Sequence, residues 1–112
     1  MIGYVTLGVS DLAKAKAFYS DLLSEVGGKT LLEMDRIVFF GQSMAKPMLA
    51  VCIPFNKEAA HPGNGNMVSF TPGSKEAAAA LYQKAIELGA TCDGAPGQRQ
   101  PDQAMPQHLA AR

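Results

Sequence analysis

The sequence predicts an α+β fold in which one strand–helix module occurs twice. The segment that begins at Tyr4 returns as the segment that begins at Asn66. With this offset Gly27 falls on Gly89. Each copy joins a short run of strand-like residues to a longer run of helical periodicity, and each helical run stops at a glycine. A duplicated module of this kind implies a pseudo-symmetric domain.

The first module opens with a strand and a helix. Apolar and polar side chains alternate over Tyr4–Leu7, as in a half-buried strand. Ser10 and Asp11 then supply a helix N-cap. The apolar stripe of the helix consists of Leu12, Ala15, Tyr19, Leu22 and Val26. Gly27 and Gly28 follow, which is typical of a left-handed C-cap that ends a helix.

Three further strands complete the first module. Apolar-rich runs occupy residues 29–34, 36–41 and 47–53, and polar residues or turn signals separate them. Residues 1–56 are therefore predicted to form a βαβββ module. A loop over residues 57–65 is predicted to join it to the second module.

The second module is predicted to be shorter, with the order βαβ over residues 66–96. A strand is expected at residues 66–70, and Ser74 is expected to cap the next helix. The apolar stripe of that helix consists of Ala78, Leu81, Ala85 and Leu88. A short returning strand is expected at residues 90–92, after the glycine stop at Gly89.

Residues 97–112 are predicted to form a polar tail. Pro101 and Pro106 exclude a central strand across this segment, because proline donates no hydrogen bond to a sheet. Residues 104–112 are expected either to form one frayed helical turn or to be disordered. The 112 residues as a whole are predicted to form a single domain with a modest core.

Composition excludes several classes of function. The formal net charge is zero and the Lys and Arg residues are scattered singly, so the sequence predicts no binding to nucleic acid. Binding to a membrane surface is not expected for the same reason, and no apolar run approaches the roughly 20 residues of a membrane span. We expect a cytoplasmic protein. Cys52 and Cys92 lie in strand-like runs far apart, which indicates reduced, buried thiols.

The opening motif carries a resemblance to a known family. Residues 4–12 read YVTLGVSDL, and residues 17–19 and 22–23 continue with AFY and LL. This start is similar to that of the vicinal oxygen chelate superfamily, which includes glyoxalases, bleomycin resistance proteins and ring-cleaving dioxygenases. The resemblance covers about residues 2–96. It implies paired βαβββ modules whose curved sheets enclose a cleft, with the second module truncated.

The resemblance also implies positions for a divalent metal. The first ligand position of the family, usually His, is Tyr4 in this chain, and the Glu of the fourth strand falls at or near Cys52. The second-module His falls on Asn66, and the fourth position has no counterpart. A phenol, a thiol and a carboxamide do not make a shell for a hard or borderline ion. We therefore expect no cofactor, and a family-type metal site is disfavoured.

Strand alternation selects the residues expected to line the cleft whether or not a metal is present. If the modules pair as in the family, we expect Tyr4, Cys52 and Asn66 to converge. The full set of expected ligand-binding residues is Tyr4, Thr6, Phe40, Met48, Cys52, Asn66 and Phe70. The alternative is that Tyr4 and Cys52 are ordinary core residues and that Asn66 caps a turn.

Three functional hypotheses follow. The first is a protein that binds a small molecule in the cleft without the family metal. The second is a metal-dependent lyase or isomerase of the glyoxalase type. The third is a degenerate dimerising domain without a ligand. A shortened second module leaves strand edges unpaired, so we also expect a homodimer in which a second copy covers them.

Overall fold

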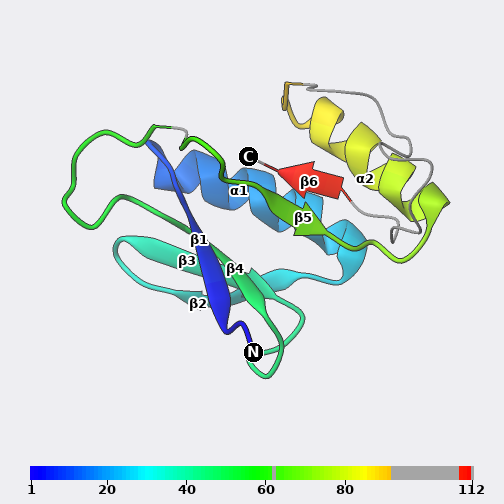
Figure 1. Cartoon of the computed structure of the whole chain (residues 1–112), viewed down its shortest axis with the longest axis horizontal. Helices are drawn as coiled ribbons and strands as arrows, with labels where there is room; N and C mark the ends of the chain where they lie inside the picture. Colours follow the sequence, from blue (N-terminus) through cyan, green and yellow to red (C-terminus); the bar gives the residue numbers. More distant parts are fainter. Residues whose placement is uncertain (62, 92–108, 112) are drawn as a thin grey trace. The chain divides into compact units, whose positions relative to one another are not determined.

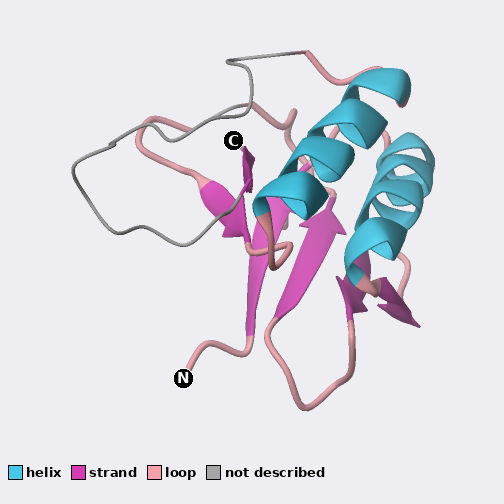
Figure 2. Cartoon of the chain, turned by 90° about the vertical axis from the view of Figure 1, so that its right-hand side faces the viewer, coloured by secondary structure: helices cyan, strands magenta, loops and turns pink. Residues whose placement is uncertain are grey.

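The computed structural model describes residues 1–61, 63–91 and 109–111. The chain divides into two compact units, Met1–Gly63 and Asn64–Arg112. Among the described residues, each unit contains one α-helix and one sheet. Figure 1 shows the order of the elements along the chain, and Figure 2 distinguishes helices from strands by colour.

The first unit has the predicted order βαβββ. Its elements are β1 (Tyr4–Gly8), α1 (Leu12–Leu23), the short 3-10 helix η1 (Ser24–Val26), β2 (Lys29–Glu33), β3 (Ile37–Gly41) and β4 (Met48–Cys52). The sheet has the strand order β1-β4-β3-β2. β1 runs parallel to β4, and the other neighbours are antiparallel. The predicted α+β fold with a βαβββ first module is confirmed.

Local signals define both ends of the first helix. The carboxylate of Asp11 accepts a hydrogen bond from the backbone N–H of Lys14 at 3.0 Å, as an N-cap does. At the other end Gly27 has a φ of 76°, which glycine adopts without strain. The N–H of Gly28 donates to the carbonyl of Leu23 at 2.8 Å, which closes the end of the helix in a Schellman motif.

α1 covers one face of the four-stranded sheet. Val38, Phe40 and Val51 are fully buried on this side, and the ring of Tyr19 lies 6.3 Å from that of Phe40. Leu22 and Leu23 of α1 are also buried. This side is the hydrophobic core that fixes the helix on the sheet.

The second unit contains β5 (Val68–Phe70), α2 (Lys75–Glu87) and β6 (Leu109–Ala111). The Ser74 hydroxyl accepts a hydrogen bond from the N–H of Ala77 at 3.0 Å, so the predicted cap is confirmed. Ala78 and Leu81 are buried, as the apolar stripe predicts. β5 pairs antiparallel with β6, which gives the module the truncated order βαβ.

Two details of the second module differ from the prediction. Ala90 and Thr91 do not form a strand, and Cys92 lies outside the described residues. The N–H of Ala90 instead donates to the carbonyl of Ala85 at 2.9 Å, and Gly89 has a φ of 101°. This is the same Schellman ending as in the first unit, so the segment closes the helix and does not open a strand.

The second strand of the module lies in the segment predicted to be a polar tail. Leu109–Ala111 forms β6, with Ala110 opposite Ser69 of β5. The prediction of a frayed helical turn or a disordered end is wrong for these residues. Pro101 and Pro106 lie outside the described residues.

Candidate functional site on the face opposite the helix

The sheet of the first unit has a second face, which we call the distal face because it points away from α1. Its residues on β1, β3 and β4 are Tyr4, Thr6, Gly8, Ile37, Phe39, Gly41, Met48, Ala50 and Cys52. Ile37, Phe39, Ala50 and Cys52 form one buried cluster, and Met48 packs against it. This face is a second apolar surface on the same sheet.

An aromatic pair stands at one end of the distal face. The ring of Tyr4 meets that of Phe39 edge to face, with the centroids 4.9 Å apart and the planes at 83°. Phe39 is buried, whereas Tyr4 is 52% exposed. Register places Tyr4 beside Met48. The result is a partly exposed aromatic and thioether surface, which is typical of sites for apolar ligands.

The polar chemistry of this face is sparse. Tyr4 and Thr6 supply hydroxyl groups, and Cys52 supplies a free thiol that is buried. None of the positions that β1, β3 and β4 contribute to this face carries a charged side chain. A ligand held there would find hydrogen-bonding groups but no opposite charge.

One expected site residue, Phe40, lies on the other face of the sheet. Phe40 was expected in the cleft wall, but it is fully buried on the side covered by α1. The neighbouring Phe39 occupies the face that carries Tyr4. Adjacent residues of a strand point to opposite faces, so only one of the two rings can belong to the site. Phe39 therefore replaces Phe40 in the candidate site.

The expected convergence of Tyr4 and Cys52 is wrong. Both side chains belong to the distal face, but Tyr4 pairs with Met48 at one end of the strands and Cys52 pairs with Gly8 at the other. They lie four residue steps apart along the strand direction, or about 13 Å at about 3.3 Å per residue. A parallel pairing fixes this distance, and the sequence alone did not show the register.

Asn66 and Phe70, the other expected site residues, belong to the second unit. Asn66 is exposed and precedes β5 by two residues, so the strand is shorter than predicted. Phe70 is half-buried in β5. Their use in a site with Tyr4 stays a prediction.

The residues at the family's metal positions do not fit a divalent ion. Tyr4 has Met48 as its neighbour on β4, and Thr6 has Ala50, so the adjoining strand contributes no carboxylate there. Over the described ranges, no three His, Cys, Asp or Glu side chains gather in a way that could hold a metal. Phenol and thioether groups are poor ligands for the hard or borderline ions that this family uses.

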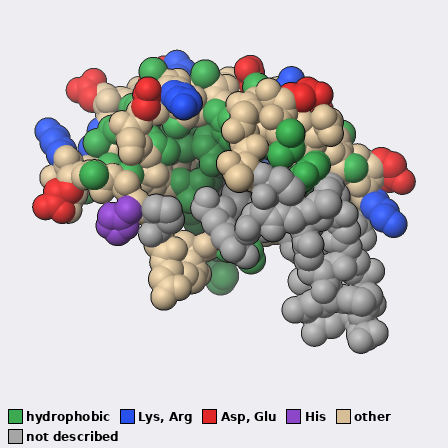
Figure 3. All heavy atoms as spheres, turned by 90° about the horizontal axis from the view of Figure 1, so that it is seen from above, with side chains coloured by type: hydrophobic (Ala, Val, Ile, Leu, Met, Phe, Trp, Pro, Cys, Tyr) green, Lys and Arg blue, Asp and Glu red, His purple; other side chains and the backbone are tan. Residues whose placement is uncertain are grey.

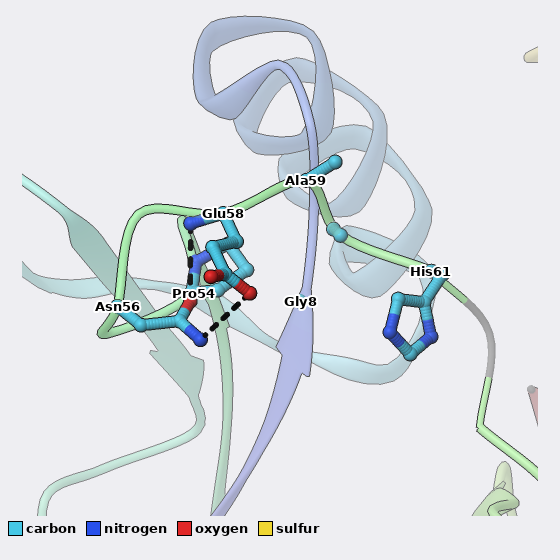
Figure 4. A pocket seen from close by; sticks show the side chains of 7 residues that line it. Gly8, Pro54, Asn56, Glu58, Ala59 and His61 are labelled. Carbon is cyan, nitrogen blue, oxygen red and sulfur yellow. Dashed lines mark hydrogen bonds between the residues drawn. The ribbon is translucent and has the colours of Figure 1, made fainter.

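A hollow of about 220 Å³ lies beside the end of β1. Gly8, Pro54, Asn56, Glu58, Ala59, Ala60 and His61 line it (Figure 4). The Asn56 side chain holds the loop in shape, because its carbonyl oxygen accepts from the N–H of Glu58 at 3.0 Å. No sequence pattern indicates this hollow, because its walls come from the end of β1 and from the loop after β4, which are far apart in the chain.

On the face that Figure 3 shows, the Lys and Arg side chains lie among Asp, Glu, polar and apolar groups and form no patch of one charge sign. None of the helices in the described part of the chain is long and apolar enough to span a membrane.

Comparisons with known proteins support the fold and the resemblance. The sequence model of the Glyoxalase/Bleomycin resistance protein/Dioxygenase superfamily matches residues 1–105. A glyoxalase/bleomycin resistance protein from Albidiferax ferrireducens T118 is similar in structure, with a TM-score of 0.74 and 28% identity over 83% of this chain and 74% of the other. A putative glyoxalase from Bacillus halodurans shares the fold, with a TM-score of 0.58 and 23% identity over 80% of this chain and 69% of the other. No curated protein matches the chain.

Proposed function

Because the chain belongs to the Glyoxalase/Bleomycin resistance protein/Dioxygenase superfamily, we propose that it binds a small, uncharged, partly aromatic molecule on the distal face without a divalent metal. The observation that carries this proposal is the pair of Tyr4 and Phe39. A buried ring supports a half-exposed ring, and Met48 lies beside it. Such a surface can stack with another flat apolar group.

The chemistry of the face favours an uncharged ligand. An aromatic ring placed against Tyr4 and Met48 would gain the burial of apolar surface and about 0.5–1.5 kcal/mol from each well-placed aromatic contact. The hydroxyls of Tyr4 and Thr6 are available for one or two orienting hydrogen bonds. A charged group on the same ligand would lose its hydration without meeting an opposite charge.

A metal-dependent lyase is the competing function. It requires an ion that polarises neighbouring substrate oxygens, and Tyr4, Met48 and Cys52 offer no carboxylate or imidazole for one. Elemental analysis of the purified protein, followed by thermal melting with Zn²⁺, Ni²⁺, Mn²⁺ and Fe²⁺, separates the two functions. Near-stoichiometric metal with a clear rise in Tm would overturn the proposal, because a ligand of the native state must stabilise it.

Binding itself is tested with 2-naphthol as a neutral probe and 2-naphthoate as its charged counterpart. The chain has no Trp, so naphthyl fluorescence is read with little protein background. We expect the neutral probe to bind with micromolar to millimolar affinity and the anion at least about tenfold more weakly, because its carboxylate finds no partner. Equal binding of both probes, or of neither, would contradict the proposal.

A matched pair of variants locates the probe. Tyr4→Ala is expected to weaken naphthol binding about tenfold, because it removes the exposed ring of the site. Phe55→Ala serves as the control: Phe55 is 86% exposed in the loop after β4, where its ring lies under the Arg36 guanidinium at 5.2 Å. A loss of binding in the control alone would show adsorption to exposed aromatic surface and not binding at the distal face.

A further inference from the structure

The chain passes from the first unit to the second through a loop that contains an Asn-Gly pair. The boundary falls between Gly63 and Asn64, and Asn64 and Gly65 lie in a bend outside the helices and strands. Gly65 has a φ of 87°, a conformation that glycine adopts without strain. The shape of the bend therefore explains why a glycine directly follows Asn64.

This glycine leaves the backbone next to the Asn64 side chain uncrowded. A Cβ built at Gly65 meets no atom within 4 Å, and Asn64 and Gly65 are both exposed. No described residue forms a hydrogen bond with the Asn64 amide, and none accepts one from the N–H of Gly65. The amide carbon of Asn64 can therefore approach the backbone nitrogen of Gly65, because neither group is held elsewhere.

The two other asparagines of the chain, Asn56 and Asn66, lack this combination. The carbonyl oxygen of Asn56 accepts a hydrogen bond from the N–H of Glu58 at 3.0 Å, and its amide nitrogen donates to the Glu58 carboxylate at 3.3 Å. Asn66 is exposed, but the residue after it is Met67, whose Cβ crowds the backbone nitrogen that would have to attack. The structure therefore singles out Asn64.

We propose that Asn64 is a site of spontaneous modification, at which the backbone nitrogen of Gly65 attacks the side-chain amide and water then converts Asn64 to aspartate and isoaspartate. In the first step the Gly65 nitrogen loses its proton to hydroxide and forms a bond to Cγ of Asn64. The bond from Cγ to Nδ2 breaks, and the leaving nitrogen takes up a proton and departs as ammonia. The product is a cyclic imide, and no oxidant or reductant takes part.

Water opens the imide at either of its two carbonyl carbons. Attack at Cγ breaks the new bond to the Gly65 nitrogen and leaves aspartate in an ordinary peptide chain. Attack at the backbone carbonyl carbon breaks the original peptide bond, so the chain continues through Cγ and isoaspartate results. Both products carry a new carboxylate, and isoaspartate also lengthens the main chain by one carbon.

The modification adds charge to a segment that has no acidic residue of its own. Between Glu58 and Glu76 the sequence contains neither Asp nor Glu, and the formal net charge of the chain falls from zero to minus one. The inference does not rest on the proposed function, because Tyr4, Phe39 and Met48 all belong to the first unit.

The test incubates the purified chain at neutral pH and physiological temperature in water enriched in heavy oxygen. Samples are digested at acid pH, because alkaline digestion would itself drive the reaction, and fragmentation in the mass spectrometer assigns the modified position. We expect Asn64 to give two acidic products of equal mass, each with one heavy oxygen. Asn64 should react at least about tenfold faster than Asn56 or Asn66, because the attack geometry is open only there.

A matched pair of variants tests the position without a digest. Asn64→Gln keeps an amide side chain but would have to close a larger ring, so the acidic form of the chain should stop accumulating in ion-exchange chromatography. Asn66→Gln is the control and should accumulate the acidic form at the wild-type rate. Both residues are exposed, so neither variant is expected to disturb the fold.

Unfolding in urea tests the contribution of the structure. Asn56 should react faster in the unfolded chain, because its two hydrogen bonds to Glu58 are lost. Asn64 should react at about the same rate in the folded and the unfolded chain, since the fold leaves it open.

Four outcomes overturn the inference. Equal rates at the three asparagines would mean that the loop does not single out Asn64. Aspartate without isoaspartate would mean that water cleaves the amide directly and that no imide forms. An acidic form that accumulates undiminished in Asn64→Gln would come from another residue. A much faster reaction of Asn64 in urea would mean that the folded chain protects this site.

Discussion

The two faces of the four-stranded sheet are built from the same strands but serve different ends. Phe40 lies under α1 without any exposed surface, and its ring meets Tyr19 of the helix. Phe39, its neighbour in β3, supports the half-exposed ring of Tyr4 on the distal face. One face forms a closed core between the sheet and α1. The other face carries Tyr4, whose ring is partly exposed to water. Two adjacent residues of one strand therefore lie in very different surroundings, one in a closed core and one beneath a ring that is partly exposed.

The largest expected effect comes from Phe40→Ala. Removal of a fully buried phenyl ring leaves a cavity between sheet and helix and is expected to lower the free energy of unfolding by about 3–5 kcal/mol. Phe39→Ala is expected to lower the free energy of unfolding by less, because the half-exposed Tyr4 can move toward the space. Of the two variants, only Phe39→Ala should weaken naphthol binding. Urea unfolding and probe titration of both variants measure the two effects. Equal losses of stability and binding in both variants would show that the faces are not distinct.

The two ends of α1 could be predicted from the sequence. The cap at Asp11 and the glycine ending at Gly27 act within a few residues, so the sequence predicts where α1 begins and ends. The choice between Phe39 and Phe40 depends on which face the helix covers, and two adjacent phenylalanines give no sign of it. The register of β1 on β4 is equally non-local, which is why Tyr4 and Cys52 were expected together.

In the second unit, too, the local features could be predicted and the non-local pairing could not. Gly89 ends α2 in the same way that Gly27 ends the first helical segment, and the internal repeat predicts both. β6 was missed because its three residues carry no strand pattern of their own. Their extended conformation depends on pairing with β5, about forty residues earlier in the sequence, and no local preference reports such a pairing.

A smaller expected difference between the two faces is the dependence of stability on pH. Burial beneath α1 raises the pKa of Tyr19 above its usual value of 10.0, because a phenolate there would lose its hydration. The unfolded chain therefore ionises first as pH rises. The stability linked to neutral Tyr19 is complete below pH 10 and decreases as pH rises from the unfolded pKa through the higher folded pKa.

Tyr19→Phe is expected to remove this part of the alkaline loss, because phenylalanine has no proton to release. Thermal melting of the variant and the wild type between neutral pH and pH 11 measures the difference in slope. Tyr4→Phe, on the distal face, is the matched control. An equal flattening in the control would show that the alkaline loss does not come from the helix-covered side.

The smallest effect is expected at the rim of the helix-covered face, where Lys16 of α1 meets Glu33 of β2. Their 2.7 Å ion pair is short, but the side chains are 39% and 52% exposed, so water and salt screen the attraction. Lys16→Met is expected to change the free energy of unfolding by only about 0.2–0.5 kcal/mol, and salt should have little effect on the variant. Glu33→Gln should give a similar change, and the double variant should show almost no additional loss if the two charges act only on each other. A loss near that of Phe40→Ala, measured by urea unfolding, would mean that this charged rim, and not the apolar core beneath it, holds α1 on the sheet.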